Sequence, residues 1–267
     1  MKIVEIIKNR LESEITKLNN NFNNSNKDFG CRYCCIDNFL PEDVVNIISN
    51  KFPSYKSMRF LNSHREQKYT SKQFSQFDPI ISEVAFSLQH PEVIKIIEKI
   101  TGIKNQMGDP SFYAGGVSAM LYDNFLNPHL DNSHNYNLDA YRTLNLLFYI
   151  TPDWKYEDGG HLELWDTRVK KNKVIESKFN RLVLMETNQI SWHSVCKVKK
   201  KGLARNCISN YYFSKNSPTG NNYANVTEFN GRPDQKIRRF ICLIDNYVRN
   251  FIRKVNKKGF SKVDLNN

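Results

Sequence analysis

The stretch RTLNLLFYITPDW, residues 142–154, indicates how the fold of this chain of 267 residues is built. Its first part, residues 142–150, is a short apolar and aromatic run that predicts a buried strand, and Thr-Pro-Asp then predicts a turn. Four further segments follow, separated by turn residues: GGHLELW from Gly159, RLVLME from Arg181, HSVCKV from His193 and ARNCISNYYF from Ala204. Short strands at this spacing predict an all-β sandwich or jelly roll.

Two histidines and one aspartate in this region have the composition of an iron site. On an extended segment successive side chains alternate, so His129 and Asp131 point to one face while Leu130 points to the other. His193, on a distant strand, would complete a two-histidine, one-carboxylate face of an octahedral metal. That arrangement suits non-haem Fe(II) and leaves three open positions, of which two could hold a chelating 2-oxoacid and one O2.

A 2-oxoacid such as 2-oxoglutarate has a second carboxylate that must be held away from the metal. Arg205 is the candidate for this role, because arginine offers a planar, permanently charged fork. The alternative is that Arg205 is an ordinary surface charge beside the lysines at 199–201. For His129 the alternative is a hydrogen-bonded loop histidine, and for Asp131 a turn residue, since a His-x-Asp pair alone is a weak motif.

Several motifs in a fixed order strengthen the metal-site hypothesis. They extend from Gly115 to Phe213 and are HLDN at His129, Tyr141-Arg142, FYITPDW, GGHLELW, KFNRLVLMET at Lys178, WHSV at Trp192 and RNCISNYYF at Arg205. Together they resemble the prolyl 4-hydroxylase-like branch of the 2-oxoglutarate- and Fe(II)-dependent oxygenases, which includes the hypoxia-sensing prolyl hydroxylases. The resemblance implies a mainly β fold with a double-stranded β-helix (jelly roll) core.

The resemblance also implies roles for individual residues. The catalytic iron ligands that it implies are His129, Asp131 and His193. Arg205 is implied as the partner of the distal 2-oxoglutarate carboxylate; Tyr149 resembles the tyrosine that also bonds that carboxylate, and Tyr122 an aromatic hydroxyl facing the metal and cosubstrate. Residues predicted to line the substrate cleft are Arg142, Asn132, Trp154 and Trp192. His134 and His161 are excluded as ligands, because a fourth protein ligand would fill a position needed by the substrates.

The expected activity is a dioxygenase reaction with Fe(II), 2-oxoglutarate and O2, and ascorbate is a further candidate cofactor. Asp131 favours hydroxylation, because related halogenating oxygenases lack this carboxylate. The main hypothesis is hydroxylation of a C–H bond in a small-molecule or lipid- or sugar-linked substrate, with release of succinate and CO2. The alternative is a peptidyl-prolyl (protein) hydroxylase, and a remote alternative is a non-catalytic jelly-roll binding module.

Cysteine usage and hydropathy indicate where the protein works. The six cysteines are scattered apart from Cys31, Cys34 and Cys35, and no second pair or suitably spaced histidines complete a zinc site. We therefore expect reduced thiols in a cytoplasmic protein. No apolar run approaches the length of a membrane span, and Glu5 and Lys8 interrupt what could have been a signal-peptide core.

The sequence predicts three regions. Residues 1–26 are expected to form an N-terminal helix, with apolar positions at helical spacing up to Leu18, and an Asn-rich linker; residues 27–230 form the oxygenase domain; residues 231–267 form a basic amphipathic helix and tail. Within the domain, the pattern predicts a strand over 31–37 and helices over 41–52 and 80–100, the last ended by Gly102. These N-terminal helices are expected to brace one face of the barrel.

Positive charge is concentrated in the last region. Between Arg232 and Lys262 there are ten Lys or Arg against two Asp, so +8 of the net charge of +12 lies there. The favoured interpretation is a helix packed on the barrel or against a second subunit as a homo-oligomer, followed by peripheral contact with an anionic membrane or acidic partner. Nucleic acid is the least favoured partner, and the expected substrate is a small molecule or a peptide.

Overall fold

The computed structural model describes residues 2–25 and 29–255. In this part of the chain, twelve strands join one strongly curled sheet in which every pairing is antiparallel. The strands are β1 (Tyr33–Ile36), β2 (Arg59–Asn62), β3 (Glu66–Ser71), β4 (Gly116–Met120), β5 (Phe125–Leu130), β6 (Tyr141–Tyr149), β7 (Leu162–Trp165), β8 (Asn172–Ile175), β9 (Arg181–Glu186), β10 (His193–Val195), β11 (Arg205–Ser214) and β12 (Glu228–Phe229).

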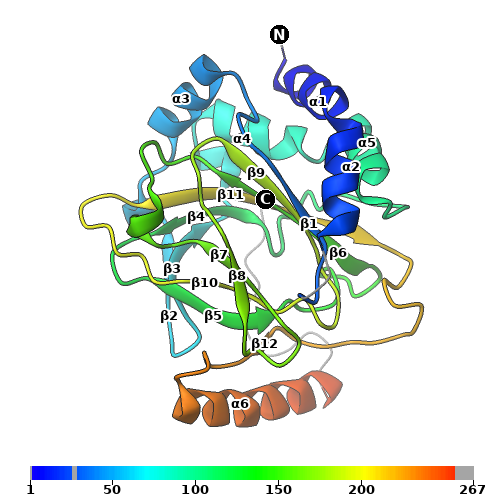
Figure 1. Cartoon of the computed structure of the whole chain (residues 1–267), viewed down its shortest axis with the longest axis vertical. Coiled ribbons are helices and arrows are strands. Elements are labelled where there is room, and N and C mark those ends of the chain that lie inside the picture. The colour runs from blue at the N-terminus through cyan, green and yellow to red at the C-terminus, as the bar shows by residue number, and fades with distance from the viewer. Residues whose placement is uncertain (1, 26–28, 256–267) are drawn as a thin grey trace.

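The strand order is β1-β9-β6-β11-β4-β3-β5-β10-β7-β8, with β2 paired to β3 and β12 to β5. Strand β3 pairs with both β4 and β5, so it connects the two halves of the curl. Inside the curl, Leu162 and Leu164 of β7 meet Val183 and Met185 of β9 in an apolar cluster. This is the mainly β, double-stranded β-helix architecture expected from the sequence, and Figure 1 shows how the sheet folds over on itself.

Helices occupy two sides of the sheet (Figure 1). They are α1 (Ile3–Ser13), α2 (Ile15–Asn24), α3 (Glu42–Lys51), α4 (Pro79–Ser87), α5 (Pro91–Thr101) and α6 (Lys236–Val255), with short 3₁₀ turns η1 (Tyr55–Ser57), η2 (Phe74–Gln76) and η3 (Tyr156–Asp158). Helices α1 to α5 lie together on one side and share the main apolar core with β6, β9 and β11. Helix α6 lies on the opposite side, next to β12.

Two expectations for the N-terminal half are corrected by the structure. The Asn-rich stretch, predicted to be a linker, is helical up to Asn24 and forms the second half of α2. Leu18 and Phe22, one helical turn apart, are fully buried, and this burial compensates for the low helix propensity of asparagine. The predicted helix over 80–100 is two helices, broken where Pro91 begins α5 and His90 caps it by accepting a hydrogen bond from the Glu92 amide.

Other expectations agree with the structure. The predicted strand at 31–37 appears as β1 and the helix at 41–52 as α3. Gly102 ends α5 in the left-handed region at φ 75°, where a residue without Cβ is unstrained. No helix among residues 2–25 and 29–255 has both the length and the apolar character needed to cross a bilayer. The division of the chain into three regions, with boundaries after residues 26 and 230, stays a prediction.

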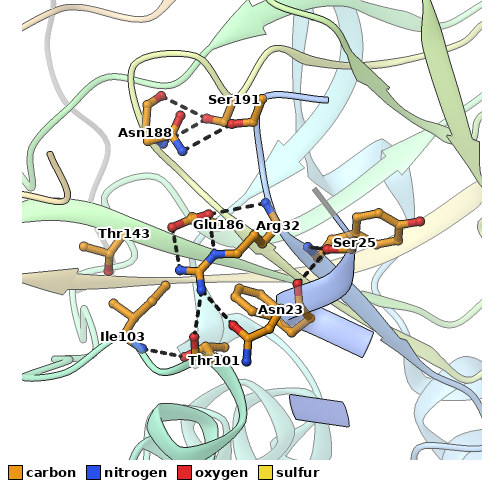
Figure 2. Close-up of polar contacts among 12 residues, drawn as sticks. Asn23, Ser25, Arg32, Thr101, Ile103, Thr143, Glu186, Asn188 and Ser191 are labelled. Atoms are coloured by element: carbon orange, nitrogen blue, oxygen red, sulfur yellow. Dashed lines mark hydrogen bonds and ion pairs between the residues drawn. The ribbon is translucent and has the colours of Figure 1, made fainter. Parts of the chain in front are cut away.

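A half-buried ion pair joins the helical layer to the sheet. Arg32, just before β1, makes a two-pronged contact with Glu186 at the end of β9, with nitrogen–oxygen distances of 2.8 and 2.9 Å. Its third nitrogen donates to Asn23 of α2 at 2.9 Å and to the Thr101 carbonyl of α5 at 3.4 Å. Figure 2 shows the guanidinium between these partners. One side chain therefore ties two helices to the edge of the sheet.

We expect Arg32→Met to lower the free energy of unfolding by about 1–3 kcal/mol, because it leaves the Glu186 carboxylate half-buried without its charged donor. Urea denaturation monitored by circular dichroism measures the change. The control is Lys17→Ala. The Lys17 side chain is 68% exposed and pairs with Glu14 at the surface, so its loss should change the free energy of unfolding by no more than about 0.5 kcal/mol. Equal effects of the two substitutions would contradict the role assigned to Arg32.

Candidate metal and cosubstrate site

Antiparallel pairing of β5 with β10 sets His129 directly opposite His193. Their imidazole rings lie with centroids 4.1 Å apart, and both side chains are buried. Asp131 follows the last residue of β5, so it points to the same face as His129. Two imidazoles from adjacent strands and the carboxylate that follows one of these strands therefore face one point.

The distances suit a single metal ion. The Asp131 carboxylate lies 3.7 Å from Nε2 of His129 and 3.6 Å from Nε2 of His193. The three donor atoms all lie within 4.8 Å of one another, and they are the one His/Cys/Asp/Glu group of this kind in the described ranges. Two imidazoles and one carboxylate form the facial donor set associated with non-haem Fe(II).

Backbone carbonyls fix both histidine rings. Nδ1 of His129 lies 3.0 Å from the Asn127 carbonyl oxygen, and Nδ1 of His193 lies 2.9 Å from that of Ser191. A carbonyl can only accept, so each Nδ1 carries the proton and donates it. Each Nε2 is then left with a free lone pair directed to the common point, as metal-binding histidines require.

The charge of Asp131 is stabilised by its neighbours. Burial alone raises the pKa of this carboxyl, but Arg142 and the two histidines outweigh burial and hold the pKa below its ordinary value. Nη1 of Arg142 lies 3.0 Å from Oδ1, and Asn145 donates to Oδ2 at 2.8 Å. Burial, followed by the proximity of His193, lowers the pKa of His129 to about 3. At neutral pH the site offers an anionic oxygen and a neutral His129 nitrogen.

A cavity of about 420 Å³ opens beside the three donors. Alternate residues of two neighbouring strands line it, as the period of a strand requires: Asn145, Leu147 and Tyr149 of β6, and Arg205, Cys207, Ser209 and Tyr211 of β11. Apolar side chains from other strands complete the wall near the donors, among them Met120, Leu126, Leu162 and Val195. The cavity can therefore hold a small organic acid next to a metal while limiting access of water.

Arg205 has spare hydrogen-bonding capacity at the cavity wall. It is 4% exposed, and in the part of the chain that the structure describes no carboxylate lies within 4.0 Å of its guanidinium. Its Nη2 donates to the thioether of Met120, a weak acceptor, at 2.9 Å, and its buried Nε has no partner among those residues. A buried, unpaired guanidinium is costly, so this side chain fits a carboxylate ligand.

Two neighbours shape the surroundings of Arg205. The guanidinium carbon lies 5.2 Å from the ring centre of Tyr149, whose pKa burial raises, so the phenol stays protonated and can donate. Gly160, at φ 68°, leaves room for the arginine, because a Cβ there would lie 3.1 Å from Cδ of Arg205. The unpaired guanidinium, the protonated phenol and the space beside them are therefore suited to bind the carboxylate of a 2-oxoacid.

The segment before α6 forms a further wall. The ring of Phe229 on β12 stacks on His129 with a centroid distance of 5.4 Å. The guanidinium groups of Arg65 and Arg249 lie 5.9 and 5.7 Å from the centre of the Phe229 ring, and both bond to Asp245. Phe229, Arg65 and Arg249 line the cavity, and Asp245 lies outside its lining. The sequence motifs did not indicate this wall.

With this geometry established, comparison with known proteins is informative. Residues 116–213 match the sequence model of the 2OG-Fe(II) oxygenase superfamily. This part of the chain is therefore similar to a 2OG-Fe(II) oxygenase domain. The match covers the motif range found in the sequence and confirms the resemblance to prolyl 4-hydroxylase-like oxygenases. Members of the superfamily use Fe(II), 2-oxoglutarate and O2, and the donor set of the oxygenase agrees with these cofactors.

Relatives and solved structures extend the comparison. The oxygenase is 29% identical over 77 residues to the prolyl 3-hydroxylase OGFOD1 of Mus musculus; the match covers 27% of this chain and 14% of that protein. Its fold is similar to a Trichoplax adhaerens prolyl hydroxylase solved with a hypoxia-inducible-factor peptide (21% identity, TM-score 0.55, 77% of this chain and 92% of the other). A Pseudomonas putida prolyl 4-hydroxylase has a TM-score of 0.54 at 14% identity, with coverage of 74% and 98%.

The structure brings together some predicted site residues and separates others. Asn132 and Arg142 line the cavity beside the donors, whereas Tyr122 does not: its side chain is 50% exposed and contacts Lys201. Trp154 is also outside the cavity, because it packs with Met120, Val195 and Val198 and donates to the Gly159 carbonyl. Trp192, the residue before β10, does not line the cavity either.

The two histidines excluded as ligands lie apart from the donor set. His161 is held by the backbone, since Nε2 lies 2.8 Å from the Tyr156 carbonyl and Nδ1 accepts from the Ser177 amide. Nδ1 of His134 bonds to Ser133. The sequence analysis did not identify Asn145 and Tyr211 as cavity residues. Every second residue of a strand faces the same side, so counting back from Tyr149 in steps of two reaches Asn145, and counting forward from Arg205 reaches Tyr211.

We expect His193→Ala to weaken binding of Fe(II), or of Mn(II) as an air-stable substitute, by about 100-fold or more. Loss of a hydrogen-bond partner of a metal ligand already lowers metal affinity by about 10- to 100-fold, and loss of the ligand itself costs at least as much. Anaerobic titration calorimetry measures the affinity. His161→Ala is the matched control, a buried histidine bonded only to backbone groups, and should bind metal like the unmodified protein. Wild-type affinity in His193→Ala would exclude His193 as a ligand.

Proposed function

We propose that this oxygenase hydroxylates a prolyl residue of a peptide or protein substrate, using Fe(II), 2-oxoglutarate and O2. The observation that carries the catalytic part is the His129, Asp131 and His193 donor set facing the same cavity as the unpaired Arg205. In the overall reaction one oxygen atom of O2 enters the substrate C–H bond as a hydroxyl group. The other enters succinate, which forms from 2-oxoglutarate with loss of CO2.

The choice of a prolyl substrate is supported by the comparisons. The curated relatives are named prolyl 3-hydroxylases, although the chain spans only 14–15% of their length. Structures named as prolyl hydroxylases share the fold at TM-scores above 0.5. The small-molecule hypothesis has less support, since the similar structure of the epimerase SnoN, at 10% identity and a TM-score of 0.52, shows only that the same fold also occurs in nogalamycin biosynthesis.

Each side chain has a defined task in this proposal. His129, Asp131 and His193 hold Fe(II), which when bound supplies the oxidising chemistry together with 2-oxoglutarate and O2. Arg205 binds the distal carboxylate of 2-oxoglutarate as a fixed cation, and Tyr149 donates a hydrogen bond to it.

Supporting residues keep these groups in place. Arg142 fixes the Asp131 carboxylate while lying 4.4 Å from the centre of the Tyr211 ring, so its guanidinium cannot turn toward the cosubstrate without losing both contacts. Leu147 and Leu162 keep water away from the reacting atoms. The protein's contribution is therefore geometry and desolvation.

The substrate class is tested by incubating the oxygenase with proline-containing peptide pools and, separately, with metabolite pools. We expect peptides to stimulate succinate formation and to gain one oxygen atom on proline, as mass spectrometry detects. Asp131→Ala should reduce this activity to background, because the remaining two donors cannot hold the metal in place. Stimulation by a free metabolite and by no peptide would contradict the prolyl proposal while leaving the oxygenase chemistry intact.

The role of Arg205 has its own test. Arg205→Ala should raise the KM for 2-oxoglutarate by about 10- to 100-fold, because one two-pronged charge-assisted contact is worth about 1.5–3 kcal/mol. Initial rates measured against 2-oxoglutarate concentration give the KM. Arg59→Ala, an exposed arginine on β2, is the control and should leave the KM unchanged. An unchanged KM in Arg205→Ala would mean that the distal carboxylate binds elsewhere.

A further inference from the structure

Helix α6 is attached to the body of the protein by its polar face. Asn246 exchanges two hydrogen bonds with the backbone of Phe229, at 2.7 and 2.9 Å, and Arg249 donates to the Thr227 carbonyl at 2.6 Å. Arg239 bonds to the Gly231 carbonyl at 3.1 Å. The polar residues that a surface helix normally turns to water therefore face the protein.

The opposite face of α6 is apolar and exposed. Its central row consists of Ile237, Phe240, Ile244, Tyr247 and Phe251, which we name the apolar seam, and their exposed fractions lie between 49% and 79%. Ile241 and Val248 beside the row are 45% and 47% exposed. Figure 1 shows that α6 lies on the outside of the molecule, away from the other helices, so no described element covers this face.

The spacing within the apolar seam is that of a helix-pairing surface. The intervals are three, four, three and four residues, the a and d positions of two heptads. A seam of this type buries itself by interdigitating with a second helix of similar pattern. Exposed apolar patches of this extent mark interaction sites in soluble proteins.

We propose that the apolar seam binds the α6 helix of a second copy of this chain, so that two antiparallel helices pair across a two-fold axis near Ile244. The seam contains no charged side chain and is self-complementary, as a two-fold interface requires. Eight large apolar residues of α6, the seam together with Ile241, Leu243 and Val248, are 45% to 79% exposed. They offer an extended surface for an interface, which in stable complexes buries roughly 800 Å² per partner.

Helix dipoles favour the antiparallel arrangement. Antiparallel helices place the positive end of one dipole beside the negative end of the other, whereas parallel helices place like ends together.

Other occupants of the seam fit less well. An anionic membrane would be attracted by basic side chains flanking the apolar face, but Arg239 and Arg249 bond to backbone carbonyls of the body and Arg238 packs over the Phe125 ring. Residues 256–267 contain three large apolar residues, Phe260, Val263 and Leu265, against five in the seam. A second copy supplies a matching seam of the same length.

Light scattering coupled to size-exclusion chromatography tests the proposal on the full chain between about 1 and 100 µM, a range that detects micromolar dissociation constants. We expect a mass close to twice 31.3 kDa. Ile244→Glu and, independently, Phe240→Glu should raise the dissociation constant by about 100-fold, since each places a charge on both sides of the interface. The matched control is Ile47→Glu on α3, because Ile47 is 48% exposed and Ile244 is 49% exposed.

Circular dichroism melting of each variant checks that the exposed substitutions leave the fold intact. A monomer at every concentration of the unmodified chain would overturn the proposal, as would a dimer that both seam variants leave unchanged. Vesicles of phosphatidylcholine and phosphatidylserine test the alternative: sedimentation of a monomeric protein with them, lost in Ile244→Glu, would identify a membrane as the occupant and overturn the dimer.

Cross-linking tests the orientation. Ile244→Cys should form a disulfide-linked dimer on mild oxidation, because the two-fold axis brings each copy of this residue next to itself. In mixtures of Ile237→Cys and Phe251→Cys proteins, the mixed dimer should dominate over the two self-linked species. Predominant self-linking of Ile237→Cys would indicate parallel helices and overturn the antiparallel arrangement. The unmodified chain, whose Cys242 on α6 is buried, sets the background.

Discussion

The register between β5 and β10 is the constraint on which the site depends. His129 and His193 are paired residues of adjacent antiparallel strands, and a slip by one residue would turn one imidazole to the opposite face of the sheet. The register is supported from both sides, since β10 also pairs with β7 and β5 also pairs with β12. The two rings then need only a backbone carbonyl each to fix their orientation. The catalytic geometry is thus a property of sheet pairing more than of loop conformation.

Local pattern in the sequence predicts a large part of this architecture. Strands β6, β9, β10 and β11 were found because each is a short apolar run between turn residues. The metal donors and Arg205 were found because their side-chain chemistry is distinctive and their order matches a known family. Helix α2 was missed for the opposite reason: its Asn-rich sequence has low helix propensity, and only the tertiary burial of Leu18 and Phe22 makes it helical.

Features that depend on distant contacts could not be predicted in the same way. Strand β3, with the sequence EQKYTS, has no apolar alternation and exists because β4 and β5 offer it open edges. Tyr122 was placed at the metal by resemblance, yet it follows the end of β4 and turns outward to Lys201. The wall formed by Phe229 lies beyond the region that defines the family, and nothing local to β12 indicates that its ring rests on His129.

The small space beside Arg205 has a consequence for reading related sequences. A Cβ at position 160 would come within 3.1 Å of the Arg205 side chain and within 2.9 Å of Val198, and the backbone there has φ 68°. A homologue with a larger residue at this position would keep its imidazoles and aspartate but would have to move the guanidinium. We expect such a protein to keep its metal donors and to bind the oxoacid less tightly, so position 160 bears on the cosubstrate rather than on the metal.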